Sequence, residues 1–241
     1  MKINVHAGHN PDGKVACGAV GLIKESTENR KVKNEVIRML KALGHTVYDC
    51  TVDNGTSQAN ILTNIVKKCN AHEVDLDVSI HFNSGASDAK GNGKTTGTEV
   101  LVYSAKSKAK QYAKNVCAAI AELGFANRGV KTNANLYVLR KTDAPAMLIE
   151  CCFVDDKDDV VIYDHRTMAE AIVYGITGER YNEPFDESED AESSKSGSET
   201  TTGSGKTLFR VQVGAYTNKE NAQVMQQKLK RAGFDAVITR E

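Results

Sequence analysis

The stretch Val74-Asp75-Leu76-Asp77-Val78-Ser79-Ile80-His81-Phe82-Asn83 decides the fold that we expect for this chain. Its β-branched and other apolar residues predict a buried strand, and a histidine stands near its end. In open α/β sheets, functional side chains lie just outside the carboxyl ends of the strands. The stretch therefore predicts both a central strand and a functional role for His81.

Two other runs repeat this arrangement. Lys2-Ile3-Asn4-Val5 is followed by His6-Ala7-Gly8-His9-Asn10, and Ala146-Met147-Leu148-Ile149 is followed by Glu150. If these strands end at one edge of a sheet, histidines and a carboxylate meet there. Such side chains are the usual ligands of a catalytic zinc ion, so the three runs together indicate a zinc site.

Segments with helical periodicity alternate with the predicted strands. Helices are expected over residues 29–43, 61–69, 109–120 and 168–176, and the remaining strands over residues 46–50, 98–103 and 136–139. Strands that alternate with helices predict an α/β fold, a mainly parallel twisted sheet with helices on both faces. We assign residues 1–182 to this domain.

The end of the chain has a different composition. Residues 183–206 are mostly Glu, Asp, Ser, Thr and Gly, which cannot bury enough apolar surface to offset their ordering entropy, so we expect a flexible linker. Residues 207–241 predict a strand ending at Val213, a helix and a closing strand over residues 235–239. This small βαβ unit is short for a domain that folds alone.

The bulk composition excludes several classes of protein. Lys+Arg and Asp+Glu both number 31. The chain therefore lacks the excess of positive charge that would indicate a nucleic-acid partner. No apolar run is long enough to span a bilayer. The six cysteines show no C-x-x-C spacing and are expected to be buried free thiols. The first residues predict a strand instead of a signal peptide, so we expect synthesis in the cytoplasm and another route out of it.

The residue pattern alone leaves the third zinc ligand open. His9 and His81 are the first two ligands, and either Glu25 or Glu28 could be the third, although both could also be solvated acids at the start of a helix. His6 competes with His9, and we expect it to have a supporting or packing role.

Glu150 is the unusual carboxylate of the chain. Four apolar residues precede it and Cys151-Cys152-Phe153 follows it, so burial is expected to raise its pKa. One interpretation is a buried ion pair with a base such as Arg140. We favour the other, in which Glu150 is the catalytic residue, a general base that takes a proton from a water molecule.

Taken together, the motifs resemble those of the zinc-dependent N-acetylmuramoyl-L-alanine amidases of the amidase-3 type, over residues 1 to about 180. The family's D-A-G-H-G is similar to His6-Ala7-Gly8-His9-Asn10, with histidine in place of aspartate. Its E-K-x-x-N resembles Glu25-Ser26-Thr27-Glu28-Asn29, which selects Glu25 as the third ligand. S-I-H-x-N matches residues 79–83, and P-A-x-L-x-E matches residues 145–150.

The resemblance implies zinc-dependent hydrolysis of the amide bond between N-acetylmuramic acid and L-alanine in peptidoglycan. It implies that His9, Glu25 and His81 hold the zinc. Asn10 and Asn83, beside two of these ligands, are expected to contact the substrate. Two alternatives stay open: a zinc peptidase that cleaves a bond of the stem peptide, and a non-catalytic wall-binding protein with a structural zinc.

Residues 207–241 resemble the first half of a SPOR domain, a module that binds the glycan strands of peptidoglycan. Its R-V-Q-V-G strand corresponds to Arg210-Val211-Gln212-Val213-Gly214. A complete domain repeats the βαβ unit, so a homodimer formed through this tail is one way to complete it. The whole organisation is similar to that of phage endolysins and sporulation wall hydrolases, which reach the wall after holin action or mother-cell lysis.

Overall fold

The computed structural model describes residues 1–181 and, in the tail, residues 213–214, 222–223, 225–226, 229 and 234–239. The chain forms two units, Met1–Tyr181 and Asn182–Glu241. None of the helices in these described residues has the length and hydropathy needed to cross a membrane.

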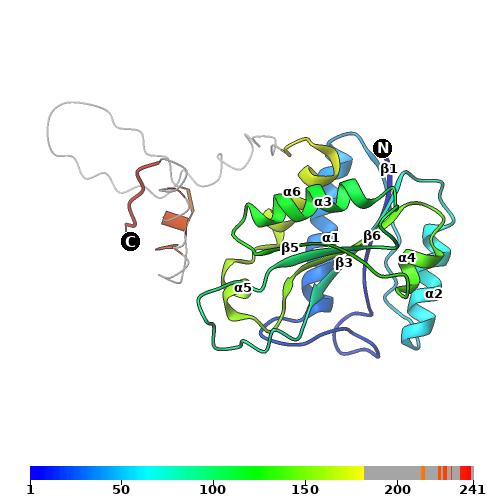
Figure 1. Ribbon diagram of the computed structural model, residues 1–241, viewed down its shortest axis with the longest axis horizontal. Coiled ribbons are helices and arrows are strands. Elements are labelled where there is room, and N and C mark those ends of the chain that lie inside the picture. Colours follow the sequence, from blue (N-terminus) through cyan, green and yellow to red (C-terminus); the bar gives the residue numbers. More distant parts are fainter. Residues whose placement is uncertain (182–212, 215–221, 224, 227–228, 230–233, 240–241) are drawn as a thin grey trace, which may run out of the picture. The chain divides into compact units, whose positions relative to one another are not determined.

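The first unit contains alternating strands and helices (Figure 1). Its strands are β1 (Lys2–Ala7), β2 (Thr46–Asp49), β3 (Leu76–Asn83), β4 (Thr98–Val102), β5 (Asn127–Thr132) and β6 (Ala146–Phe153). Its helices are α1 (Glu25–Ala42), α2 (Gln58–Cys69), α3 (Lys110–Ala121), α4 (Tyr137–Lys141), α5 (Lys157–Ile162) and α6 (His165–Thr177).

The strands form one six-stranded sheet in the order β2-β1-β3-β6-β4-β5. All neighbouring pairs are parallel except β4 and β6, which are antiparallel. The predicted α/β fold with a mainly parallel sheet is therefore confirmed. Strand β6, the last strand of this sheet in chain order, lies between β3 and β4 and so occupies the middle of the sheet.

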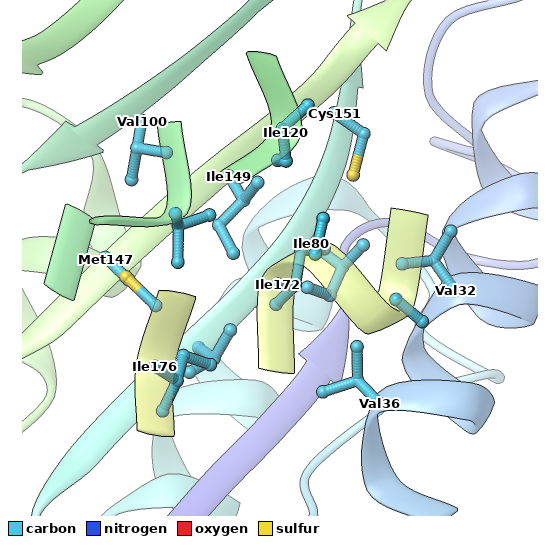
Figure 2. Close-up of a cluster of buried hydrophobic side chains, with 14 of the residues drawn as sticks. Val32, Val36, Ile80, Val100, Ile120, Met147, Ile149, Cys151, Ile172 and Ile176 are labelled. Carbon is cyan, nitrogen blue, oxygen red and sulfur yellow. The ribbon is translucent and has the colours of Figure 1, made fainter. Parts of the chain in front are cut away.

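Helices α1, α3 and α6 cover one face of the sheet. Figure 2 shows Val32 and Val36 of α1 with Ile172 and Ile176 of α6, all directed at the strands. The opposite face is covered by α2 and α4, whose apolar side chains pack with strand residues in a second, smaller cluster. Burying apolar side chains on both faces stabilises the folded state by about 25 cal/mol for each Å² of apolar surface removed from water. This packing holds the strands, and the loops at their ends, in place.

Two local predictions differ from the structure. The strand expected over residues 136–139 is wrong: these residues enter α4, where the Arg140 amide donates to the Leu136 carbonyl at 3.1 Å. A short apolar run fits a buried helix turn as well as a strand, and here the helix packs on the core. Strand β5 was not predicted because its sequence, Asn127–Thr132, is mostly polar and contains Gly129. Such a sequence can form this strand because β5 lies at the edge of the sheet, where polar residues are tolerated.

In the tail, the predicted helix agrees with the described residues 222–223, 225–226 and 229, which are helical. The closing strand predicted over residues 235–239 is wrong, because residues 234–239 have no regular secondary structure. A strand needs a hydrogen-bonded neighbour and a core to pack on. Phe234 and Val237 are instead 64% and 82% exposed. The predicted linker, residues 183–206, lies outside the described residues.

Candidate metal centre and active site

Three predicted ligands, His9, Glu25 and His81, lie together. Their donor atoms all fall within 4.8 Å of one another. Oε1 of Glu25 is 2.9 Å from Nδ1 of His81 and 3.4 Å from Nε2 of His9. One residue comes from the loop after β1, one begins α1 and one lies in β3. Two imidazole nitrogens and a carboxylate oxygen are a donor set that fits zinc.

The Glu25 carboxylate is almost fully buried. Its Oε1 accepts from the Phe82 amide at 3.2 Å, and its Oε2 accepts from the Ala19 amide at 2.8 Å. Burial raises the pKa of Glu25, but hydrogen bonds and charge interactions with His81 and His9 lower this pKa by more, so it ends well below its usual range. Glu25 is therefore an anion, which is the form that binds a metal.

Two glycines leave room for these ligands. A Cβ atom at Gly8 would overlap the imidazole ring of His81, and one at Gly18 would overlap the Glu25 carboxylate and the ring of His9. Gly18 also has φ +82°, a conformation that favours glycine. Neither position can carry a side chain without moving a ligand.

The backbone that presents His9 is unusual. His9 has φ +65°, in the left-handed region that residues other than glycine seldom adopt. The side chain of Asn29 donates to the Gly8 carbonyl at 2.9 Å, and Nη2 of Arg30 donates to the His9 carbonyl at 2.9 Å. Arg30 is itself held by Asp53 at 2.7 Å. Helix α1 thus supplies the predicted ligand Glu25 at its first residue and, one turn later, holds the loop that carries His9.

The alternative ligand Glu28 points elsewhere. Its Oε1 accepts from Nζ of Lys31 at 2.9 Å, and its Oε2 accepts from the Tyr163 hydroxyl at 3.1 Å. Glu28 does not belong to the cluster of donor atoms that His9, Glu25 and His81 form among the described residues. The geometry therefore favours Glu25.

His6 is buried beside the cluster without joining it. Its Nδ1 lies 3.4 Å from the Ser79 hydroxyl. Burial, together with the neighbouring His81, lowers the pKa of His6 to about 3, so this ring is neutral. A neutral, enclosed imidazole fits the expected packing role.

Glu150 lies in the same row of side chains as His81. Strand register places Glu150 of β6 opposite His81 of β3 and opposite Glu99 of β4, so the three side chains share one face of the sheet. The expectation that the two strands stop at His81 and Glu150 is wrong, because β3 continues to Asn83 and β6 continues to Phe153. The apolar residues after Glu150 keep β6 in the sheet.

The Glu150 carboxylate has an unpaired oxygen. Within the described part of the chain, its Oε2 is buried with no hydrogen-bond partner. Burial, and then the charges of Glu25 and Glu99, raise the pKa of Glu150 to about 8. The alternative ion pair with Arg140 is wrong, because that guanidinium lies 5.9 Å over the ring of Tyr137 instead.

The two asparagines expected to contact substrate differ. Asn10 is fully buried, its Nδ2 donates to the carbonyls of Val15 and Gly55, and its Oδ1 accepts from the Gly55 amide. A side chain so engaged holds two loops together and cannot also face a substrate, so this prediction is corrected. Asn83 is partly exposed, and its Nδ2 donates to Oε1 of Glu99 at 3.3 Å.

Sequence reasoning missed Glu99 and Arg128, which extend the row across the sheet. Nε of Arg128 in β5 donates to Oε2 of Glu99 at 2.8 Å. Neither residue follows a long apolar run, so no local signal marked them, and only the pairing of the strands brings them to the site.

Comparison with known proteins identifies the family. The model of the N-acetylmuramoyl-L-alanine amidase family Amidase_3 matches residues 3–178, and the SPOR domain model matches residues 189–240. The catalytic domain of the CD27L endolysin targeting Clostridia Difficile superposes with a TM-score of 0.66 at 28% identity, covering 76% of this chain and 99% of that one.

Relatives by sequence agree with this match. An uncharacterised protein of Clostridium perfringens is 39% identical over 167 residues, which are 68% of this chain and 47% of that protein. The N-acetylmuramoyl-L-alanine amidase CwlM of Bacillus licheniformis is 27% identical over 188 residues, 76% of this chain and 64% of CwlM. This chain spans less than half the length of the Clostridium perfringens relatives. It belongs to the Amidase_3 family of N-acetylmuramoyl-L-alanine amidases.

Proposed function

We propose that the protein hydrolyses the amide bond between N-acetylmuramic acid and L-alanine in peptidoglycan, with a zinc ion held by His9, Glu25 and His81. The observation that carries this proposal is the strand register that places Glu150, whose buried Oε2 has no hydrogen-bond partner among the described residues, beside His81 of that donor set. Family membership supports the same reaction.

The chemistry divides between the metal and the protein. A zinc ion bound at the centre would polarise the amide carbonyl and acidify a water molecule. Glu150 takes the proton of the attacking water at Oε2 and passes it to the departing nitrogen of L-alanine. The raised pKa of Glu150 suits this task, since a general base works best with a pKa near the working pH. The buried Glu25 carries a negative charge beside the cation that it would bind.

The bond that is cut tests the proposal. Purified peptidoglycan digested by the full chain should release intact stem peptides that carry a new free amine on L-alanine, as measured by mass spectrometry after amine labelling. A zinc peptidase would release shortened stem fragments, and a wall-binding protein with a structural zinc would release nothing. Either of those results would overturn the proposed reaction.

We also propose that residues 1–182 form the catalytic domain, that residues 183–206 link it to the tail, and that the SPOR-like residues 207–241 bind glycan strands. The SPOR domain model supports the last point, although its match begins at residue 189, inside the proposed linker. A flexible linker of this length spans about 25–30 Å, so a bound tail would raise the local concentration of scissile bonds. The tail could act alone or as a homodimer.

Removal of residues 183–241 is therefore expected to leave hydrolysis of small soluble muropeptides unchanged and to weaken both attachment to intact cell walls and their lysis. Co-sedimentation with purified walls and turbidity loss measure the two effects. Analytical ultracentrifugation of the full chain and of the truncated chain shows whether the tail makes a dimer. Equal attachment by the two chains would contradict the role of the tail.

We infer that the protein acts on the cell wall after synthesis in the cytoplasm and release by a holin or by mother-cell lysis. The likeness to an endolysin of Bacillus phage SPP1 and to a sporulation-specific amidase of Bacillus subtilis supports this route. Fractionation of producing cells before lysis, followed by immunoblotting, tests it, because a protein already in the wall fraction would exclude the route.

A further inference from the structure

Four neighbouring strands place a line of side chains across one end of the sheet. His81 of β3, Glu150 of β6 and Glu99 of β4 are direct register partners and point to the same face. The hydrogen bond from Arg128 to Glu99 adds β5 to this line. Neighbouring strands lie about 4.8 Å apart, so the backbone of Arg128 is about 10 Å from that of Glu150.

The guanidinium of Arg128 contacts Glu99 and Phe153 and is otherwise accessible to solvent. Its Nε donates to Oε2 of Glu99 at 2.8 Å, and its Cζ lies 5.1 Å from the centre of the Phe153 ring. No other hydrogen bond or ion pair of this side chain occurs among the described residues, and the side chain is 40% exposed. Both terminal NH₂ groups are therefore available to a ligand, in an orientation that Glu99 and Phe153 have already fixed.

Such a fork fits a carboxylate better than any other group in the proposed substrate. Two parallel N–H donors of arginine bind the two oxygens of a carboxylate, and this charge-assisted pair is among the stronger polar contacts. The carboxylates of Glu25 and Glu99, whose charges act on Glu150, would repel an anionic substrate. Arg128 is the cation that joins this line of side chains, so it marks the place where an anionic group can be accepted.

The distance fits the second residue of the stem peptide. An extended peptide advances about 3.3 Å per residue, so a carboxylate on the second residue lies roughly 7–10 Å from the amide that is cut. Muropeptides carry at this residue a carboxyl group that is either free or amidated. Resting on the proposed function, we propose that Arg128 is a binding site for this free carboxylate and makes the enzyme discriminate against the amidated form.

Two soluble muropeptides that differ only in a carboxylate or a carboxamide on the second stem residue test the proposal. The full chain should cleave the carboxylate form with a kcat/KM about 10- to 100-fold higher, the range of one lost charge-assisted pair. Arg128→Gln should bring this ratio close to one, mainly by raising KM for the carboxylate substrate. The matched control is Lys131→Gln, which removes an exposed cation from the same strand and should keep the full ratio.

Zinc content and the thermal midpoint of each variant show whether it is folded and loaded. Arg128→Lys is a second variant, for the case in which Arg128→Gln does not fold. It keeps the positive charge but loses the two parallel N–H donors. A reduced ratio of kcat/KM between the two substrates supports the site, and an unchanged ratio contradicts it. Equal cleavage of both substrates by the parent chain, or a full ratio in Arg128→Gln, overturns the inference. Failure of the zinc-loaded parent to cleave either substrate overturns the proposed function instead.

Discussion

Glu150→Gln is expected to lower the turnover of soluble muropeptides about 10²- to 10⁴-fold, the usual effect of a lost general base. Glutamine has nearly the shape of the glutamate and keeps the packing of β6, but it cannot take a proton from water. In the parent, the buried Oε2 of Glu150 has no hydrogen-bond partner among the described residues, and the pKa of Glu150 is raised to about 8; both fit a group that exchanges protons with substrate and water.

The variant must keep its metal for this result to identify a base. Elemental analysis is expected to find as much zinc in Glu150→Gln as in the parent, because Glu150 lies outside the three-residue donor cluster. A variant that turned over at the parental rate would show that another group is the base. Loss of zinc would show that Glu150 is a ligand.

His81→Ala is expected to remove the metal and the activity together. The two remaining donors, His9 and Glu25, are fewer than the three protein ligands that a catalytic zinc ion takes. Deleting the imidazole also removes a hydrogen-bond partner from the buried Glu25 carboxylate, which is costly for an anion without a cation. Zinc per molecule after dialysis and the rate of amide cleavage measure the two losses.

Two neighbouring glutamates provide a matched pair for this experiment. Glu25→Gln should lose most of its zinc, whereas Glu28→Gln should retain it, since Glu28 is engaged with Lys31 and Tyr163. Full zinc in His81→Ala, or the reverse result for the two glutamates, would show that the ligand assignment is wrong.

Periodicity in the sequence predicted most of the fold because most elements bury a continuous apolar stripe. The long helices and the central strands were visible in this way, and so was their alternation. Strand β5 and helix α4 were not, because an edge strand can be polar and a short apolar run fits two conformations. The antiparallel direction of β4 was also hidden, since direction depends on which strand becomes the neighbour.

Only those site residues that belong to a recognisable sequence motif could be predicted. His9, Glu25 and His81 follow recognisable motifs. Gly8 and Gly18 matter through the side chains that pack on them, and no spacing in the sequence shows that contact. Arg30, Glu99 and Arg128 act through partners far along the chain, so their roles appear only when register and loop positions are known. Asn10 looked like a rim residue because burial cannot be deduced from its neighbours.

The position of β6 has a consequence for how the molecule is made. The ribosome delivers β4 and β5 before β6, yet β6 must enter between β3 and β4. Until about 150 residues have emerged, the sheet lacks its middle and Glu150 has no place beside His81. Pairings between segments so distant along the chain fold slowly. A polypeptide that ends before β6, whether it is still growing or has been truncated there, therefore cannot bring Glu150 beside His81, and the site is complete only when β6 joins the sheet.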